Sequence, residues 1–474
     1  MILNKIILTL IIITTYSLLS QPISSKNIRL IVLTDIENEP DDAQSMVRLL
    51  TYSNHFHIEA LVATTSTWMR NEVADWRIKE IISSYGKVKK KLDVHEKGYP
   101  DSKYLLSILK KGNPKFGMNG VGNSEDSEGS GFLIDIFEKD DDRPIWISVW
   151  GGANVLAQAL WKLNRIKTPS EVEDIIDKLR VYTISDQDDS GPWIRKNFPS
   201  LFYIVSPGFE ENWGGQYHYA TWSGISGDNF HGRFDGPDFK IVDNPWLDEN
   251  IRKNHGKLGN EHPHTEYLME GDTPSFLGLV QNGLNNPENP NYGGWGGRYE
   301  FYIPQFKKYM YYPETRPIWT NAEDEVYSNI TKRFHTSNHA TIWRWRRAYQ
   351  HDFAARIDWS NEKKYSDANH PPVPLLNHKN QITAKSGELI TLDASSSTDP
   401  DNDSLNYRWI YYKEVGTLIR HEIEIKNLDS SKINFIAPEV DEGKTIHFIL
   451  EVEDDGVPSL TRYQRVIISV LPKI

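Results

Sequence analysis

The sequence has 474 residues, a formal net charge of −12 and no cysteine. An acidic chain without a basic block argues against nucleic acids and anionic membrane surfaces as partners. The fold uses no disulfide bond, and a chain of this length buries enough apolar surface to fold without one. The length also favours two or more domains.

Residues 1–20 contain Lys5, an apolar run over residues 6–13, and small or polar residues near Ser20. This pattern predicts a secretory signal peptide. The apolar run is too short to span a bilayer and no second run of spanning length follows, so we expect no membrane span. No cysteine stands near its end for lipid attachment. We therefore expect a secreted or periplasmic protein.

A buried strand is expected at residues 28–34, which are mostly apolar and β-branched. Apolar residues recur at a spacing near 3.6 over residues 43–50, which predicts a helix. Between the two stand five carboxylates within eight residues: Asp35, Glu37, Glu39, Asp41 and Asp42. In open α/β sheets ligands bind beyond the carboxyl ends of strands, so this acidic loop is a candidate site.

The acidic loop has two possible explanations. Asp41 and Asp42 lie at or near the start of the helix, where the helix dipole favours negative charge without any further role. Five like charges so close together, however, repel one another unless a cation or a proton neutralises some of them. Carboxylate oxygens are the ligands of hard ions such as Ca²⁺ or Mg²⁺. We therefore predict a divalent cation site in this loop.

Strands and helices alternate beyond the loop. Residues 57–64 predict a strand and residues 70–85 a helix. Residues 145–150 predict another buried strand, and Gly151-Gly152 separates it from a helix at residues 153–163. Glycine permits such a tight strand-to-helix turn. Alternation of this kind predicts an α/β fold with a mostly parallel sheet.

The strand predicted at residues 179–184 is also followed by acids. Asp186 and Asp188 could accept hydrogen bonds from the hydroxyl groups of a substrate. Alternatively, Asp189 or Ser190 caps the helix that follows. Both explanations stay open at this point.

Residues 208–260 are rich in Gly, Trp, Asp and His, and a span of this kind inside a domain predicts functional loops. His264 and Glu266 follow it and could ligate a transition metal, although hydrogen bonding near a pocket is favoured. Trp295 and Arg298 stand in a Gly-rich stretch, where an aromatic plate and a guanidinium predict a substrate-binding rim.

The hydrophobic period changes to two in the last hundred residues. Short apolar segments separated by Asp, Gly and Pro predict an all-β, immunoglobulin-like or cadherin-like sandwich over residues 375–474. A Pro-rich linker is expected at residues 361–374, and the α/β domain at residues 26–360.

The motif Asp35-x-Glu37-x-x-x-Asp41-Asp42 after a first strand resembles the fingerprint of the inosine-uridine nucleoside hydrolases. With its later stretches, the sequence is similar to a secreted two-domain branch of that superfamily, often labelled cellulose-binding. This branch combines a nucleoside-hydrolase-like, Rossmann-like α/β domain with a C-terminal immunoglobulin-like domain. The usual motif has Asp at the position of Glu37 and Pro-Gly next, where this chain has Asn38 and Glu39.

The resemblance implies a Ca²⁺ ion held by Glu37, Asp42, the carbonyl of Asn154 and Asp272, with Asp35 in support. It also implies that Glu37 or a neighbouring acid takes the proton of the attacking water, and that Asp41 binds vicinal sugar hydroxyls. The catalytic candidates are thus Glu37, Asp35 and Asp41. The family's leaving-group His is replaced by Gly271.

These observations predict a secreted, Ca²⁺-dependent hydrolase of N- or O-glycosidic bonds. Export favours carbohydrate over ordinary nucleoside salvage. The alternative is a non-catalytic carbohydrate-binding protein, because Glu37 moves its carboxylate by about an ångström relative to Asp, a displacement that can cost about a hundredfold in rate. A third possibility is a scaffold that adheres through its β-domain.

Overall fold

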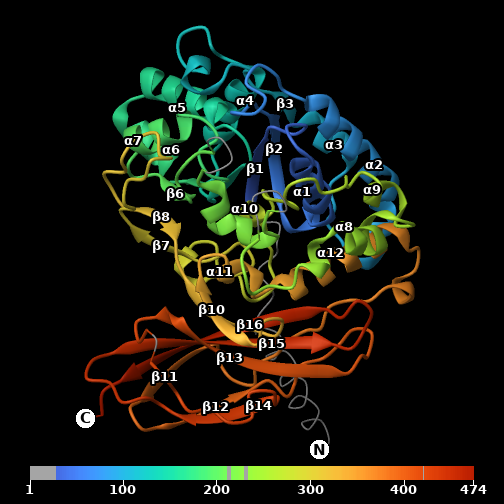
Figure 1. Cartoon of the computed structure of the whole chain (residues 1–474), viewed down its shortest axis with the longest axis vertical. Coiled ribbons are helices and arrows are strands. Elements are labelled where there is room, and N and C mark those ends of the chain that lie inside the picture. Colours follow the sequence, from blue (N-terminus) through green and yellow to red (C-terminus); the bar gives the residue numbers. More distant parts are fainter. Residues whose placement is uncertain (1–27, 211–214, 229–232, 420, 474) are drawn as a thin grey trace, which may run out of the picture.

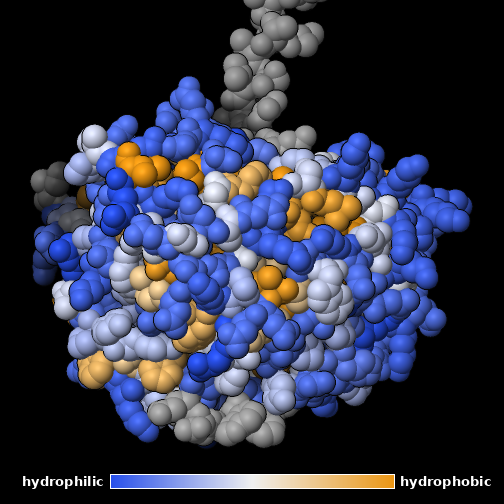
Figure 2. All heavy atoms as spheres, turned by 90° about the horizontal axis from the view of Figure 1, so that it is seen from above, coloured by the Kyte–Doolittle hydropathy of each residue, from blue (hydrophilic) through white to orange (hydrophobic). Residues whose placement is uncertain are grey.

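The computed structural model describes residues 28–473 except 211–214, 229–232 and 420 (Figure 1). The predicted signal peptide, residues 1–20, lies outside the described residues. An α/β domain packs on an all-β sandwich formed by the C-terminal strands. Within the described ranges, no helix is both long enough and apolar enough to cross a membrane. The face of the α/β domain opposite the sandwich is mostly hydrophilic, with separate hydrophobic patches (Figure 2).

One sheet organises the α/β domain. Its order in the described part of the chain is β3-β2-β1-β4-β5-β6-β8-β7, and all neighbours are parallel except β7 and β8. The strands are β1 (Arg29–Thr34), β2 (His57–Ala63), β3 (Leu109–Lys111), β4 (Ile145–Val149), β5 (Leu179–Thr183), β6 (Phe202–Val205), β7 (Tyr299–Tyr302) and β8 (Ile318–Asn321). The predicted mostly parallel α/β fold is confirmed.

Both faces of this sheet are buried, as continuous apolar strands require. In β1, Leu30 and Val32 belong to one hydrophobic core, whereas Ile31 and Leu33 belong to a core on the other face. The first core is covered by α1 (Pro40–Thr51), α2 (Asp75–His95) and α12 (Arg346–Asn361). The second is covered by α4 (Glu128–Phe137), α5 (Asn154–Ile166), α6 (Pro169–Ile176) and α7 (Ser190–Asn197).

The long stretch between β6 and α12 is mostly loops and short elements. Before α12 lies α11 (Ala340–Trp343), and at the break the amide of Trp345 donates to the carbonyl of Ile342, three residues back. This tighter turn separates the two helices. Other short elements of this stretch are α8 (Asn244–Leu247), α9 (Gly256–Gly259), α10 (Pro274–Leu277), β9 (Asp324–Ser328) and β10 (Arg333–Ser337). The short helix α3 (Ser102–Ser107) lies earlier, between α2 and β3.

The C-terminal strands form the sandwich. A sheet of order β11-β16-β15-β13 packs on the pair β12-β14, and Trp409 and Phe448 lie in the core between them. The strands are β11 (Gln381–Lys385), β12 (Leu389–Asp393), β13 (Leu405–Gly416), β14 (Lys432–Ile436), β15 (Lys444–Asp454) and β16 (Thr461–Leu471). The change of hydrophobic period to two predicted this all-β part, and the prediction is confirmed.

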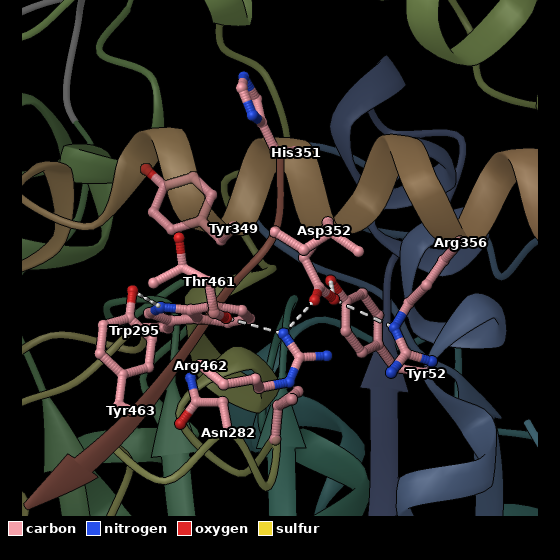
Figure 3. Close-up of polar contacts among 12 residues, drawn as sticks. Tyr52, Asn282, Trp295, Tyr349, His351, Asp352, Arg356, Thr461, Arg462 and Tyr463 are labelled. Carbon is pink, nitrogen blue, oxygen red and sulfur yellow. Dashed lines mark hydrogen bonds and ion pairs between the residues drawn. The ribbon is translucent and has the colours of Figure 1, made fainter. Parts of the chain in front are cut away.

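The outer face of the larger sandwich sheet packs into the α/β domain. Tyr412 and Tyr463 belong to the same hydrophobic core as α1 and α12. The indole nitrogen of Trp295 donates to the hydroxyl of Tyr463 at 3.3 Å (Figure 3). Arg462 reaches Asp352 on α12, with 2.5 Å between Nη1 and Oδ2. The two parts therefore share apolar contacts and a buried ion pair.

His55, in the turn after α1, is buried against Arg356 of α12. Its Nε2 is 2.8 Å from Nη2 of Arg356, so the imidazole must be neutral to accept this hydrogen bond. Burial, together with the charge of Arg356, lowers the pKa of His55 from 6.5 to about 4. Between these values the unfolded chain binds a proton that the folded chain does not. Stability is therefore complete above pH 6.5 and falls as the pH decreases towards 4.

We expect urea unfolding at a series of pH values to show this decline, with a contribution from His55 on the order of 3 kcal/mol by about pH 4. His55→Gln keeps a hydrogen-bond acceptor but does not titrate. The variant should therefore take up about one proton fewer on unfolding. An unchanged pH slope would contradict the role given to His55.

Candidate functional site

Three carboxylates from two distant segments meet at the end of β1. Asp41 and Asp42 lie in the first turn of α1, and Asp272 lies just before α10. Each offers an oxygen, and these oxygens lie within 4.8 Å of one another. All three residues are buried. The cluster sits beyond the carboxyl end of the strand, as expected for a site in an α/β sheet.

The local fold holds Asp41 and Asp42 in place. The hydroxyl of Thr34, the last residue of β1, donates to Oδ1 of Asp42. Asp41 accepts from the amide of Gly271 at 3.2 Å. A Cβ atom at Gly271 would lie 2.7 Å from Oδ2 of Asp41, so only glycine permits this approach without a shift. Gly271, which stands where the resembling enzymes have His, thus brings the Asp272 segment against α1.

Asp35 lies directly beside this cluster. It is fully buried, and neither carboxylate oxygen has a hydrogen-bond partner. A Cβ atom at Gly151 would lie 2.5 Å from Oδ1 of Asp35, so the glycine turn after β4 makes room for this carboxylate. Burial raises the pKa of Asp35 to about 6.

The cluster has no counter-charge in the described part of the chain. Burial and the charge of Asp35 raise the pKa of Asp41 to about 7. Burial also raises the pKa values of Asp42 and Asp272 well above the usual range, and the neighbouring carboxylates add to the effect. Arg48, on the same helix, pairs with Glu270 instead. A site of this kind favours a cation or bound protons.

The residues present fit a hard divalent cation. The donors of the cluster are all carboxylate oxygens, the ligand type that Ca²⁺ and Mg²⁺ prefer. Oδ2 of Asp272 is buried without a partner, as are both oxygens of Asp35. Buried polar atoms without partners are uncommon in folded proteins, and a cation bound by the cluster would satisfy these oxygens.

Glu37, predicted as metal ligand and base, lies elsewhere. Its backbone is left-handed, with φ of 77°, and its side chain is 37 % exposed. The carboxylate pairs with Nε of Arg77 on α2 at 3.2 Å, and Arg77 also holds Glu261 at 2.7 Å. The structure therefore places Glu37 outside the carboxylate cluster, because an ion pair on the surface holds it.

Asn154, predicted to offer its carbonyl to the ion, opens α5 directly after the glycine turn. Its side-chain nitrogen donates to the carbonyls of Asn113 and Lys115 at 3.0 and 2.8 Å. The side chain thus fastens the 113–120 loop to α5, while its Oδ1 is buried without a partner. No contact of Asn154 with the three clustered carboxylates is found among the described residues.

Asp186 and Asp188, the acids after β5, take different roles. Asp186 forms a buried ion pair with Arg195, in which both carboxylate oxygens accept hydrogen bonds, at 2.8 and 3.0 Å. This ion pair gives Asp186 a structural role. Asp188 accepts from the amide of Ser190 at 2.9 Å, near the start of α7. Its other oxygen is buried without a partner beside Gly152, and burial raises the pKa of Asp188 to about 6. Asp188 therefore retains an oxygen for a ligand, whereas Asp186 does not.

The four remaining candidates separate into two pairs. His264 is 66 % exposed beside Asp248, and Glu266 is exposed near Glu39, whose pKa it helps to raise. Trp295 is fully buried at the contact with the sandwich, and Arg298 is buried in an ion pair with Asp324 at 2.7 Å. The predicted rim is thus not formed by Trp295 and Arg298, because packing and pairing use both side chains.

A cavity of about 290 Å³ opens above the cluster. Acidic and aromatic side chains dominate its described lining. The acids are Glu39, Asp41, Asp42, Glu210, Asp228 and Asp272, and the rings are Trp68, Tyr217, His218, Trp222 and Tyr267. Burial raises the pKa of Glu39 well above its usual range, and the charge of Asp41 adds to the effect. The cavity thus combines a charged floor with an aromatic wall.

The aromatic residues of this cavity were not singled out from the sequence. Trp68 follows the end of β2, and the other four come from the long loops between β6 and α10. A tryptophan shortly after a strand end is a signal that could have identified Trp68, because ligands bind at that edge of the sheet. The position of the loop residues depends on packing that no local pattern reveals.

These features define a nucleoside-hydrolase-like α/β protein with an appended β-sandwich. The chain belongs to the cellulose-binding Sde182 family: the profile of its nucleoside hydrolase-like domain matches residues 29–299, and that of the Sde0182 C-terminal domain matches residues 389–470. No curated protein matches the chain significantly.

Among solved structures, a nucleoside hydrolase-related hypothetical protein from Saccharophagus degradans, associated with carbohydrate metabolism, is 34 % identical. The match covers 94 % of this chain and 100 % of that one, with a TM-score of 0.75. The effector protein XOO4466 is 8 % identical over 71 % of this chain and 92 % of its own, with a TM-score of 0.35. A PKD domain is 21 % identical over 21 % of this chain and 86 % of its own, with a TM-score of 0.16.

Proposed function

We propose that the protein is a secreted, divalent-cation-dependent hydrolase that cleaves glycosidic bonds of a carbohydrate, with Ca²⁺ as the cation. The observation that carries this proposal is the cluster of Asp41, Asp42 and Asp272, buried without a counter-charge at the floor of a cavity with aromatic walls. The names of the family and of the S. degradans protein support carbohydrate as the ligand.

In this proposal Asp41, Asp42 and Asp272 hold the cation, with Asp35 behind them. When bound, such a cation lowers the pKa of water and stabilises developing negative charge. Asp35 is the group that accepts the proton of the attacking water, because its two oxygens have no other partner and its pKa, raised by burial to about 6, keeps it ionised at neutral pH. Asp35 thus takes the role that the resemblance gave to Glu37.

The remaining lining residues orient the sugar. Asp41 lines the cavity and can accept hydrogen bonds from vicinal hydroxyls. Trp222 is fixed by a hydrogen bond from its indole nitrogen to the hydroxyl of Ser185 at 2.9 Å, and the ring of Tyr217 meets it edge-on, with centroids 5.6 Å apart. A rigid aromatic wall of this kind suits the apolar face of a sugar ring.

A non-catalytic carbohydrate-binding protein is the second candidate. Two observations favour it: Glu37 is held on Arg77, away from the cluster, and Gly271 replaces the His of the resembling enzymes. A protein of this kind would keep the cavity and the cation site but would release no product. Binding without turnover distinguishes it from the hydrolase.

The test is product analysis of nucleosides and a panel of glycans, incubated with the protein in Ca²⁺ or in EDTA. A hydrolase releases sugar only in Ca²⁺, and Asp35→Asn lowers turnover by about 10²–10⁴-fold, the usual contribution of a positioned base. Glu37→Gln is the matched control from the same loop and should retain turnover within about twofold. No release from any substrate that binds would favour the binding protein. Loss of turnover in Glu37→Gln alone would overturn the assignment of the base.

A further inference from the structure

We propose that the β-sandwich holds a second divalent-cation site, which takes Ca²⁺ and fixes the segment that joins the sandwich to the α/β domain. This site is independent of the proposed hydrolase, because it requires neither the cluster at the end of β1 nor turnover. Two observations carry it. Three carboxylates meet in one loop of the sandwich, and a fourth, deeply buried beside them, has an oxygen without a partner.

The three carboxylates come from the loop between β12 and β13. Asp399, Asp401 and Asp403 each offer an oxygen, and these oxygens lie within 4.8 Å of one another. Oδ1 of Asp399 accepts from the amides of Asp401 and Asp403 at 2.8 and 3.1 Å, while its Oδ2 is buried without a partner. Among the ion pairs of the described residues, only His370 pairs with one of the three, Asp401, and burial lowers the pKa of His370. Acidic loops are common without an ion, so the loop alone does not define a site.

The second observation is Asp454, at the end of β15, which packs against this loop. Asp454 lies opposite Leu405 where β15 pairs with β13, and the neighbouring Asp455 accepts from the amide of Ser404 at 2.8 Å. The side chain of Asp454 is buried, with an exposed fraction of the residue of 1 %. Burial raises the pKa of Asp454 to about 6, and the charge of Asp399 adds to the effect. A fourth carboxylate thus stands close to the other three.

The two oxygens of Asp454 have different surroundings. Oδ1 accepts from the side-chain amide of Asn369 at 3.0 Å, and from the backbone amides of Gly456 and Leu460 at 3.1 and 2.9 Å. These three donors fix the carboxylate. Oδ2 is buried without a partner among the described residues, which is uncommon in folded proteins. A cation held by the loop would satisfy Oδ2 of Asp454 and Oδ2 of Asp399 together.

The type of ligand and the shape of the site favour Ca²⁺. All four side chains offer carboxylate oxygens, which hard cations prefer. They come from an irregular loop and a strand end rather than from a regular framework. Ca²⁺ accepts about six to eight oxygens in variable geometry, whereas Mg²⁺ requires a near-regular octahedron.

The site also touches the segment between α12 and β11. The amide of His370 donates to Oδ2 of Asp401 at 2.7 Å, and Asn369 donates to the fourth carboxylate. The same two residues contact the α/β domain. The carbonyl of Asn369 accepts from the indole nitrogen of Trp359 on α12 at 2.8 Å, and Nε2 of His370 is 3.0 Å from Nδ1 of His95 on α2. An ion that fixes the acidic loop therefore also fixes the junction of the two parts.

The test is calorimetric titration of the full chain with Ca²⁺ in the Asp42→Asn background, in which the site at the end of β1 is weakened. We expect one Ca²⁺ still to bind, at least about tenfold more tightly than Mg²⁺, and Asp403→Asn to weaken it by at least about tenfold. The side chain of Asp403 forms no hydrogen bond or ion pair with a described residue, so this substitution removes a ligand without removing a contact of the fold. Asp441→Asn, in an exposed bend at the opposite end of β15, is the matched control and should keep the affinity within about twofold.

Digestion with trypsin measures the effect on the junction. Lys363 and Lys364 are exposed just after α12, and cleavage there requires the segment to open locally. In the Asp42→Asn background, saturating Ca²⁺ should slow this cleavage by at least about threefold, because the ion binds only the closed segment. The additional substitution Asp403→Asn should abolish the protection, and Asp441→Asn should retain it. Mass spectrometry identifies the cut.

Absence of Ca²⁺ binding in Asp42→Asn, or affinity unchanged by Asp403→Asn, would overturn the site. Equal or tighter binding of Mg²⁺ would overturn the choice of ion, and cleavage that Ca²⁺ does not slow would overturn the role at the junction. Binding that persists in Asp42→Asn and is lost with Asp403→Asn would support the site even if no glycan or nucleoside is hydrolysed. The failure of this inference and the failure of the hydrolase proposal are therefore distinguishable.

Discussion

Asp42→Asn is expected to weaken Ca²⁺ binding by about 10²-fold or more, because it removes one charged ligand from a cluster of three. The amide keeps an oxygen that can accept the hydrogen bond from Thr34, so the local fold is preserved. Isothermal calorimetry measures the change in affinity directly. Equal affinity in wild type and variant would contradict a metal site at the end of β1.

Without the ion, Asp42→Asn is expected to stabilise the folded protein, although it weakens Ca²⁺ binding. Burial and the charges of Asp35 and Asp41 raise the pKa of Asp42, so its ionised form destabilises the folded state as the pH rises through that value. Asp42→Asn should therefore melt at a higher temperature than wild type in EDTA at neutral pH, and at a lower temperature in saturating Ca²⁺. Glu37→Gln removes one charge from the same loop and is the control, with Ca²⁺ affinity within about threefold. A lower melting temperature of Asp42→Asn in both conditions would indicate simple damage to the fold.

Asp352→Ala is expected to cost about 3–5 kcal/mol of the free energy of unfolding, the usual effect of removing one partner from a buried ion pair. Asp352, on α12, lies between Arg462 of the sandwich and Arg356 of its own helix (Figure 3). It also accepts from the hydroxyl of Tyr52, just after α1, at 2.6 Å. The substitution leaves the two guanidinium groups and the phenol without this acceptor.

Urea denaturation measures the loss. Asp358→Ala is the matched control because Asp358 lies on the same helix but is partly exposed, and among the described residues its one ion pair is with His255, at 3.1 Å. A partly exposed pair of this kind contributes about 0–1 kcal/mol. A loss below about 1 kcal/mol for Asp352→Ala would show that the contact between the sandwich and α12 contributes little to stability.

The ion pair between Asp352 and Arg462 also bears on whether the α/β part and the sandwich are separate domains. The boundaries predicted at residues 361–374 stay a prediction, although the sandwich and the α/β domain share one hydrophobic core through Tyr412 and Tyr463. The change of hydrophobic period located the second fold class but contained no information on this contact. Tyr463 contacts Trp295, 168 residues earlier in the chain.

The parallel sheet could be predicted because its determinants are local. Five of the seven residues at 28–34 are apolar, and both faces of β1 are indeed buried. The acids after β1 could also be located, because a strand end in an α/β sheet faces the ligand side. Asp272 joins Asp42 in the structure, as the family resemblance implied, and the third carboxylate beside them is Asp41, which the resemblance assigned to sugar hydroxyls.

By itself, then, the sequence determined the strands, the alternation with helices, the β-sandwich and the acidic loop at the end of β1. Only the tertiary structure decided which acids face the cavity: a left-handed backbone turns Glu37 to Arg77 on α2, while Glu39 lines the cavity. It likewise buried Trp295 against the sandwich and brought Trp68 and Trp222 to the site. Apolar periodicity is a local property of the chain, whereas the direction of a side chain depends on backbone dihedrals and on partners that folding brings from distant segments.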